Sequence, residues 1–326
     1  MTFSDWRDAR PEDLAPVYAL ERGRWLTRLA WDPAPALAIV ERGRSGGYVP
    51  GFIARETDGT IAGWTFFVLH HRVLQIGGLV ARTGELVRRL LEHALKSPEA
   101  EAANEVSCFV LPGSNALESA LLRRRFAVVR YRYLRCALQG TALDLERAAR
   151  PVIVRPWHAE DGPACVRLLA RAYAGSPAAR CFAPNARLEE WAQYLGQLIA
   201  TPACGQFDQS TSAIVPGPGT GVSAALIATR VAPGTAHVAQ VAVDPGARRQ
   251  GLGRALLLHA LARARAAGDG WLSLLVADDN ASAMALYGSL GFEPVADFLY
   301  ARRSALRRPL HPPITFTEPA LADATA

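Results

Sequence analysis

Val243-Asp-Pro-Gly-Ala-Arg-Arg-Gln-Gly-Leu-Gly-Arg-Ala255 is the most informative stretch of this 326-residue chain. An alternating apolar run over residues 237–243 leads into it, and a long helical pattern follows it. The order predicts a strand, a tight turn and a helix. Gly251 and Gly253 leave backbone N–H groups uncovered beside the positive end of the helix. We therefore expect the junction to bind an anion such as a diphosphate.

Two other phosphate-binding loops do not fit this stretch. The dinucleotide fingerprint needs a third glycine, and the matching position is Leu256. A Walker loop needs Gly-Lys-Ser/Thr, and the chain has a single lysine, Lys96. An ordinary strand–helix turn without a ligand remains the structural alternative.

A second informative segment follows at residues 271–292. Its apolar start, residues 271–276, predicts a buried strand, and residues 280–289 predict a helix. Asn280 suits the N-cap of that helix, and Gly291 suits its end. The segment therefore repeats the order of a strand followed by a capped helix.

The two segments together resemble the signatures of the GNAT superfamily of N-acetyltransferases. The first is Val-x-Pro followed by Arg-x-x-Gly-x-Gly, and the second is Asn-x-x-Ala-x-x-Leu-Tyr-x-x-x-Gly-Phe over residues 280–292. The resemblance implies acetyl-CoA as acyl donor and direct attack by a primary amine. It assigns to the cofactor Val241, Ala242, Val243, Arg248, Arg249, Gln250, Gly251, Leu252, Gly253, Arg254, Ala255, Asn280, Ala283 and Tyr287.

Tyr287 is the catalytic residue that the resemblance implies. A phenol with a pKa near 10 can protonate the leaving thiolate as the C–S bond breaks. The structural alternatives are a core position for Tyr287 and a helix cap without ligand contact for Asn280. The resemblance also places an oxyanion-binding N–H near Val241 or Ala242.

The chain contains two similar halves. Arg10-Pro and Arg155-Pro each introduce an acidic turn and an amphipathic helix, and comparable strand and helix patterns follow. We expect an α/β fold of two tandem GNAT-like domains, each with a mixed, mostly antiparallel central sheet flanked by helices. The expected parts are a domain over 1–140, a catalytic domain over 151–303, and an irregular tail over 304–326.

The first half lacks the residues expected to do chemistry. Its strand at 73–80 enters a helix through Ala81-Arg-Thr-Gly84, without the proline or the Arg-x-x-Gly-x-Gly motif. Leu122 and Glu118 stand where the second half has Tyr287 and Ala283. The sequence predicts a degenerate, non-catalytic copy that packs against the second or shapes its acceptor site. Binding of CoA through unrelated residues is the alternative.

The sequence defines the residues that bind the acceptor less clearly than those that bind the cofactor. The central strand carries Gln240 where family members often have a glutamate base. Candidate substrate-binding residues are Gln240, Asp208 and Trp191. Candidate proton acceptors are His237, Asp208, His158 and a water chain. Cys204 is a weak candidate nucleophile because no histidine partner is recognisable.

Composition excludes several classes of protein. The net charge is +6, but no basic run is interleaved with aromatic residues, which disfavours a nucleic-acid partner. Five cysteines without a Cys-x-x-Cys pair suggest neither a disulfide framework nor a metal site. No signal peptide or membrane-length apolar stretch is evident, so we expect a cytoplasmic monomer or homodimer without a membrane partner.

Three functions remain open. The leading hypothesis is an N-acetyltransferase acting on a primary amine of a small molecule or a peptide. A mycothiol synthase-like acetyltransferase is a variant of it, suggested by the tandem architecture. A CoA-binding regulatory or scaffold protein without catalysis is the alternative from another class.

Overall fold

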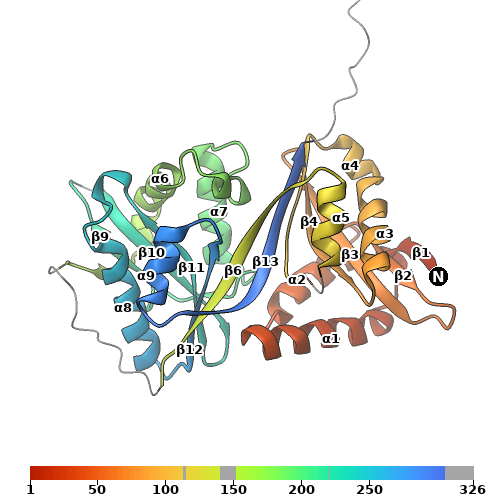
Figure 1. Ribbon diagram of the computed structural model, residues 1–326, viewed down its shortest axis with the longest axis horizontal. Helices are drawn as coiled ribbons and strands as arrows, with labels where there is room; N and C mark the ends of the chain where they lie inside the picture. Colours follow the sequence, from red (N-terminus) through yellow and green to blue (C-terminus); the bar gives the residue numbers. More distant parts are fainter. Residues whose placement is uncertain (113–114, 140–151, 220, 305–326) are drawn as a thin grey trace, which may run out of the picture.

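The computed structural model describes residues 1–112, 115–139, 152–219 and 221–304 (Figure 1). Residues 140–151, where the two predicted domains meet, and residues 305–326 of the predicted tail lie outside the described residues. We call residues 1–139 the first half and residues 152–304 the second half.

Each half contains strands and helices in a similar order. The first half has β1 (Thr2–Asp5), η1 (Trp6–Asp8), α1 (Pro11–Leu29), α2 (Ala34–Ser45), β2 (Gly51–Arg55), β3 (Ile61–His70), β4 (Val73–Ala81), α3 (Gly84–Leu95), α4 (Pro98–Ala102), β5 (Glu105–Val110), α5 (Ala116–Arg123) and β6 (Ala127–Ala137). The second half has β7 (Arg155–Pro156), η2 (Ala159–Asp161), α6 (Gly162–Ala172), η3 (Pro177–Cys181), α7 (Leu188–Ala200), β8 (Gln206–Phe207), β9 (Ala213–Pro216), β10 (Val222–Ala232), β11 (Thr235–Val243), η4 (Pro245–Ala247), α8 (Leu252–Ala266), β12 (Trp271–Ala277), α9 (Ala281–Gly288) and β13 (Glu293–Ser304).

The described strands form one continuous mixed sheet. Its order is β1-β2-β3-β4-β5-β13-β6-β12-β11-β10-β9-β7, with β8 paired to β10. The two halves exchange their last strands, because β13 pairs with β5 and β6 pairs with β12. Figure 1 shows β6 and β13 side by side at the centre, where they pair with each other. The halves therefore share a continuous sheet, and one hydrophobic cluster contains residues of both halves.

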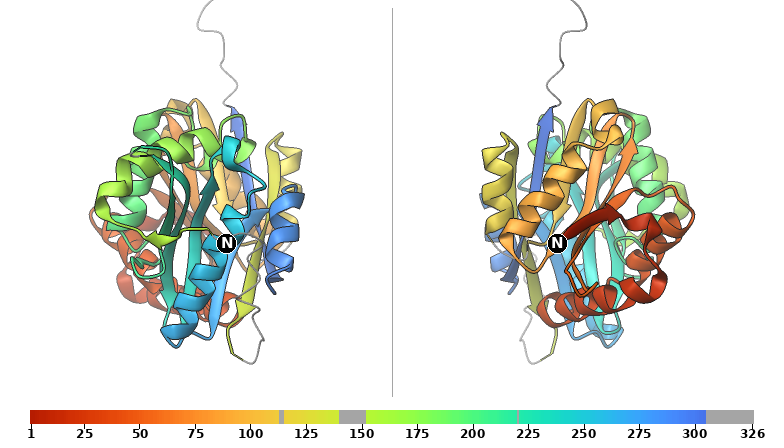
Figure 2. Two further views of the ribbon diagram at one scale, coloured as in Figure 1. Left: turned by 90° about the vertical axis from the view of Figure 1, so that its left-hand side faces the viewer. Right: turned by 90° about the vertical axis from the view of Figure 1, so that its right-hand side faces the viewer.

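Helices cover both faces of this sheet (Figure 2). On β10, Ala224, Leu226 and Ala228 pack with α8 on one face of the sheet. Ile227 packs with α6 and α7 on the opposite face. The helices α3 and α5 cover the first half on the same side as α8 and α9, and α1 and α2 lie on the side of α6 and α7. Alternation of apolar side chains along the central strands explains this two-sided burial.

Two pairs of parallel strands diverge part of the way along. β11 pairs with β12 from Thr235 opposite Trp271 to Val238 opposite Leu274, and both strands then continue unpaired with each other. β4 and β5 behave alike, with pairing that ends at Ile76 opposite Cys108. Each half therefore has an opening between two central strands. The last paired residues are Val238 in β11 and Ile76 in β4. Gln240, two positions further along β11, therefore corresponds to Gly78 in β4.

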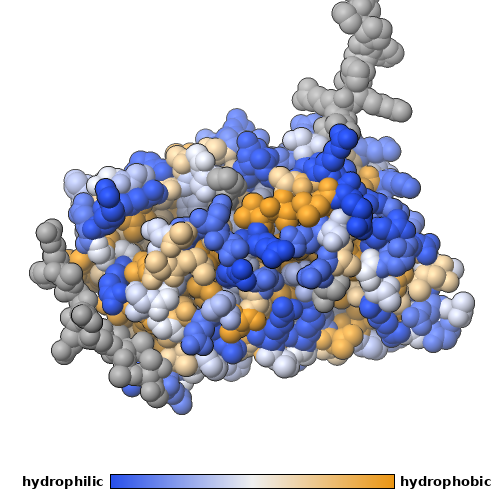
Figure 3. All heavy atoms as spheres, in the orientation of Figure 1, coloured by the Kyte–Doolittle hydropathy of each residue, from blue (hydrophilic) through white to orange (hydrophobic). Residues whose placement is uncertain are grey.

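The face that carries α5 and α9 is mostly hydrophilic (Figure 3). Hydrophobic side chains gather there mainly in one patch between the halves, where β6 and β13 run. No helix in the described part of the chain is both long and apolar enough to cross a lipid bilayer.

Candidate active site

The turn between β11 and α8 has the backbone geometry that its glycines predict. Arg249 and Gly251 adopt left-handed conformations, with φ of 61° and 84°. Asp244 holds the start of the turn by accepting from the Gly246 N–H at 3.0 Å and by pairing with Arg171 at 2.8 Å. The turn is therefore tied to the end of α6.

The first N–H groups of α8 are free. In the part of the chain that the structure describes, the N–H groups of Leu252, Gly253 and Arg254 have no protein acceptor, and Gly251 provides no side-chain cap. Unsatisfied N–H groups at a helix start combine with the helix dipole to attract anions. A Cβ at Gly251 would meet nothing within 4 Å, so space for a ligand lies beside it.

Two arginines of this loop also have structural roles. The Arg248 guanidinium donates to the Ala172 carbonyl at 2.8 Å, at the end of α6. Arg254 donates to the Ser289 hydroxyl at 3.0 Å, beyond the end of α9. They add positive charge to the cavity wall while connecting the loop to its neighbours.

The helix α9 presents the second group of predicted residues. Asn280 caps it by accepting from the Ala283 N–H at 3.2 Å, as the sequence predicted. Tyr287 is only 5% exposed, and its ring packs against Phe292 with centroids 5.9 Å apart. Burial raises the pKa of the Tyr287 phenol to about 12. The phenol therefore stays protonated at every ordinary pH.

A cavity of about 1540 Å³ connects the loop with the opposite face of the sheet. It runs along the opening between β11 and β12, and residues of α8, α9, α1 and α7 line it. Pockets for one small ligand usually measure about 300–1,000 Å³, so this cavity has room for two. Every residue that the sequence assigned to the cofactor lines it except Gln250 and Ala255.

Gln240 is held in the cavity wall by two phenols. Its Oε1 accepts from the Tyr173 hydroxyl at 2.8 Å, and its Nε2 donates to the Tyr194 oxygen at 2.6 Å. Burial, followed by the charge on Tyr287, raises the pKa of Tyr173. The place where a carboxylate base would stand is thus occupied by a neutral amide with one hydrogen-bond partner at its oxygen and one at its nitrogen.

His237 is the only one of the three candidate side-chain proton acceptors that lines the cavity. Its Nδ1 lies 2.9 Å from the Ser273 hydroxyl, which itself donates to the Ala236 carbonyl at 3.2 Å. Ser273 must therefore accept, so Nδ1 of His237 carries the hydrogen and Nε2 keeps a lone pair. Burial lowers the pKa of His237 to about 3, which keeps the ring neutral.

Three other candidates lie outside the cavity lining. Asp208 accepts from Ser210 and Thr211 and pairs with Arg230 at 3.2 Å, so it organises a turn. His158 caps η2 at the start of the second half. Trp191 is 1% exposed and packs behind the cavity wall. We therefore propose no substrate contact for these residues.

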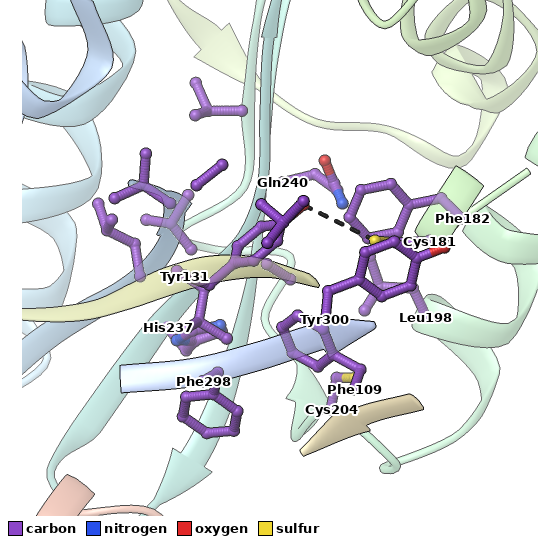
Figure 4. A pocket seen from close by; sticks show the side chains of 18 of the residues that line it. Phe109, Tyr131, Cys181, Phe182, Leu198, Cys204, His237, Gln240, Phe298 and Tyr300 are labelled. Atoms are coloured by element: carbon purple, nitrogen blue, oxygen red, sulfur yellow. Dashed lines mark hydrogen bonds between the residues drawn. The ribbon is translucent and has the colours of Figure 1, made fainter. Parts of the chain in front are cut away.

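The remaining cavity wall was not anticipated from the sequence. Figure 4 shows Phe109, Tyr131, Phe182 and Tyr300 gathered around the thiol of Cys181. Tyr131 and Tyr300 belong to the exchanged strands β6 and β13, and alternate residues on each strand are aromatic. This alternation can be seen in the sequence. The aromatic residues of β6 and β13 become neighbours, however, only because the two halves exchange their last strands. Cys204 also lines the cavity, without a histidine partner.

The first half differs from the second at the corresponding helix start. A Cβ at Gly84 would lie 2.4 Å from the Ala116 Cβ, so the start of α3 presses against the start of α5. The Thr83 hydroxyl accepts from the Leu86 N–H at 3.3 Å and caps α3 itself. The Phe66 ring covers Gly78, which occupies the position of Gln240. The start of α3 therefore leaves fewer uncapped N–H groups than the start of α8, and the start of α5 lies against it.

The described residues contain neither a cluster of metal ligands nor a disulfide. No group of three or more histidine, cysteine, aspartate or glutamate residues is placed to hold a metal ion among the described residues. All five cysteines are free thiols.

Comparison with known proteins finds family similarity in the second half. The family model described as Acetyltransferase (GNAT) family matches residues 148–292. The ribosomal protein bS18 alanine N-acetyltransferase of Escherichia coli is 47% identical over 72 residues, 22% of this chain and 49% of that protein. Mycothiol acetyltransferase of Beutenbergia cavernae is 39% identical over 119 residues, 36% of this chain and 39% of that protein. The chain thus spans half or less of these curated relatives.

Solved structures match the fold over nearly the whole chain. A GCN5-related N-acetyltransferase from Sphaerobacter thermophilus has a TM-score of 0.67 at 15% identity, covering 93% of this chain and 95% of that one. A tandem GNAT protein from the clavulanic acid biosynthesis pathway has a TM-score of 0.56 at 14% identity, covering 93% and 98%. The predicted fold class, tandem GNAT-like halves around a mixed sheet, is confirmed.

Proposed function

We propose that this protein, whose residues 148–292 match the acetyltransferase (GNAT) family model, transfers an acetyl group from acetyl-CoA to a primary amine. The observation that carries the proposal is the row of free N–H groups at the start of α8 beside the opening between β11 and β12. An anion-binding turn leading into a slot that crosses the sheet suits a long diphosphate-bearing thioester. The opposite end of the cavity is left for the acceptor.

Each part of the site has a distinct role in this proposal. The amides of residues 252–254 bind the diphosphate, and Asn280 and Ala283 line the slot. The amine nitrogen attacks the thioester carbon, and an N–H near Val241 or Ala242 stabilises the negative oxygen. As the C–S bond breaks, Tyr287 gives its proton to the thiolate. The amine proton leaves through water, because burial makes His237 too weak a base to accept it.

Thiol release tests this proposal directly. Acetyl-CoA mixed with the protein and a primary amine should give free CoA and the N-acetyl amine in equal amounts, measured by thiol titration and mass spectrometry. Tight acetyl-CoA binding without product from any amine would instead favour a CoA-binding scaffold.

We also propose that the first half does not bind acetyl-CoA and is a degenerate copy. Glu118 is engaged with Arg130 at 2.8 Å, and Leu122, at the position of Tyr287, is 55% exposed to solvent. With the contact between Gly84 and Ala116, these features support one site per chain. Native mass spectrometry should count one acetyl-CoA per chain at saturation, and a second equivalent of similar affinity would contradict the proposal.

The pH dependence of the reaction follows from the buried tyrosine. Because burial raises the pKa of Tyr287 to about 12, the proton that it donates remains present as the pH rises. A phenol with an ordinary pKa of about 10 would be half ionised at pH 10. We expect kcat/KM to rise with pH as the amine deprotonates and to show no decline below pH 10. A decline centred between pH 8 and 9 would contradict the assignment.

A further inference from the structure

The end of the cavity beyond Gln240 has a chemical character of its own. Its wall is formed by six side chains, which we call the acceptor chamber: Phe109, Tyr131, Cys181, Phe182, Phe298 and Tyr300. They come from β5, β6, η3, β13 and the residue after η3, so both halves contribute. The exchange of the last strands is what assembles them.

The aromatic side chains of the chamber are set directly opposite one another. Phe298 on β13 faces Tyr131 on β6, and Tyr300 faces Phe109 on β5. The Phe109 ring lies edge-on to Tyr131 at 5.2 Å and stacks with Phe298 at 5.6 Å. Phe109 nevertheless stays 38% exposed, although three aromatic rings adjoin it. An uncovered aromatic surface therefore faces the cavity.

The chamber offers no unpaired charge to a polar substrate. Within the described chain, the charged residues that line the cavity away from the cofactor loop and α9 are Glu21 and Arg180. Glu21 pairs with Arg24 at 3.1 Å and accepts from the Trp25 Nε1 at 2.6 Å. Arg180 lies 3.9 Å from Glu105. A polyamine or an amino sugar would lose water there without finding new partners.

One buried hydroxyl lacks a partner. Tyr300 is 4% exposed, and its hydroxyl makes no hydrogen bond with any described residue. Burial raises the pKa of Tyr300, and the nearby Cys181 thiol raises it further. The thiol nevertheless lacks the geometry of a hydrogen bond to the Tyr300 hydroxyl. The Tyr131 hydroxyl has only the long contact with the same thiol, at 3.7 Å. Buried polar groups normally have partners, so a ligand atom is the natural one.

We propose that the acceptor is a small arylalkyl primary amine whose ring carries a hydroxyl group, with Tyr300 as the residue that recognises this hydroxyl. This rests on the proposed acetyl transfer. The rings of the chamber bind the aromatic body, and the amine extends toward Gln240. An apolar chamber disfavours the ammonium form, so it promotes the neutral amine that attacks the thioester. That effect suits a site with no carboxylate base.

A panel of amines tests the proposal with the intact protein. The panel is tyramine, 2-phenylethylamine, spermidine, glucosamine and a peptide that begins with alanine, each with saturating acetyl-CoA and thiol release as the readout. We expect kcat/KM for tyramine to exceed that for 2-phenylethylamine about tenfold, and both to exceed the polar amines at least tenfold. A preference for spermidine, glucosamine or the peptide overturns the acceptor class while leaving acetyl transfer intact.

The Tyr300→Phe variant tests the recognising residue. It removes only the unpartnered hydroxyl, so the tyramine preference over 2-phenylethylamine should fall from about tenfold to about onefold. Tyr18→Phe is the matched control, because the Tyr18 hydroxyl binds Glu41 at 2.9 Å away from the cavity, and it should keep the preference. An unchanged preference in Tyr300→Phe overturns the role of Tyr300. If acetyl-CoA binds but no amine reacts, the proposed function fails, and the acceptor proposal fails with it.

Discussion

Replacing Gly251 with valine is expected to weaken acetyl-CoA binding at least a hundredfold. The new side chain would stand beside the free N–H groups of residues 252–254, in space that is open without the ligand. Each hydrogen bond to a charged group contributes about 1.5–3 kcal/mol, so losing two corresponds to roughly a hundredfold or more. Isothermal titration calorimetry with acetyl-CoA measures this change.

Gly268→Val supplies the matched control for Gly251→Val. Gly268 lies just beyond the other end of α8 and has a φ of 81°, and a Cβ there would also meet nothing within 4 Å. Placing an L-residue in this conformation costs about 1–2 kcal/mol, so both variants should lose similar stability. Only Gly251→Val should lose acetyl-CoA affinity. Equal affinities in the two variants would place the binding site elsewhere.

Tyr287→Phe is expected to lower kcat about a hundredfold and to leave acetyl-CoA affinity within about twofold. General acid catalysis usually contributes about 10²–10⁴-fold, and the substitution removes the donor while keeping the ring against Phe292. A stopped assay of N-acetyl product gives kcat, and calorimetry gives the affinity. The split between them separates a chemical role from a binding role.

Tyr48→Phe is the control for this second substitution. Tyr48 is 77% exposed and does not line the cavity. Removing its hydroxyl should therefore change neither kcat nor the acetyl-CoA affinity. If Tyr287→Phe keeps its kcat, the leaving thiolate is protonated by another group. A large loss of affinity in Tyr287→Phe would instead make Tyr287 a binding residue.

Local sequence patterns were sufficient to predict the secondary structure at the proposed cofactor end of the site. The turn at Gly251, the strand before it and the cap at Asn280 depend on residues close in sequence, so periodicity and capping rules apply. The element that the sequence analysis missed nearby, β13, begins directly after Gly291 and Phe292. Its two aromatic residues, Phe298 and Tyr300, lie on one face of the strand, but no neighbouring motif indicated a strand.

The acceptor end could not be predicted in this way. Tyr131 and Phe298 are 167 positions apart and become neighbours only because the halves exchange strands. Asp208 shows the converse problem, since a buried carboxylate near the predicted acceptor segment serves a turn and an arginine. The carboxylate suggested a catalytic or substrate-binding role for Asp208. Which side chains face the cavity depends instead on the pairing of strands that are far apart in the sequence.

The central claim is that the start of α8 binds acetyl-CoA and directs its thioester through the opening between β11 and β12. A crystal structure of the protein with acetyl-CoA tests this claim most directly. We expect the diphosphate oxygens within hydrogen-bond distance of the N–H groups of residues 252–254, and the sulfur beside Tyr287. Acetyl-CoA bound elsewhere, or in the first half between α3 and α5, would contradict the account.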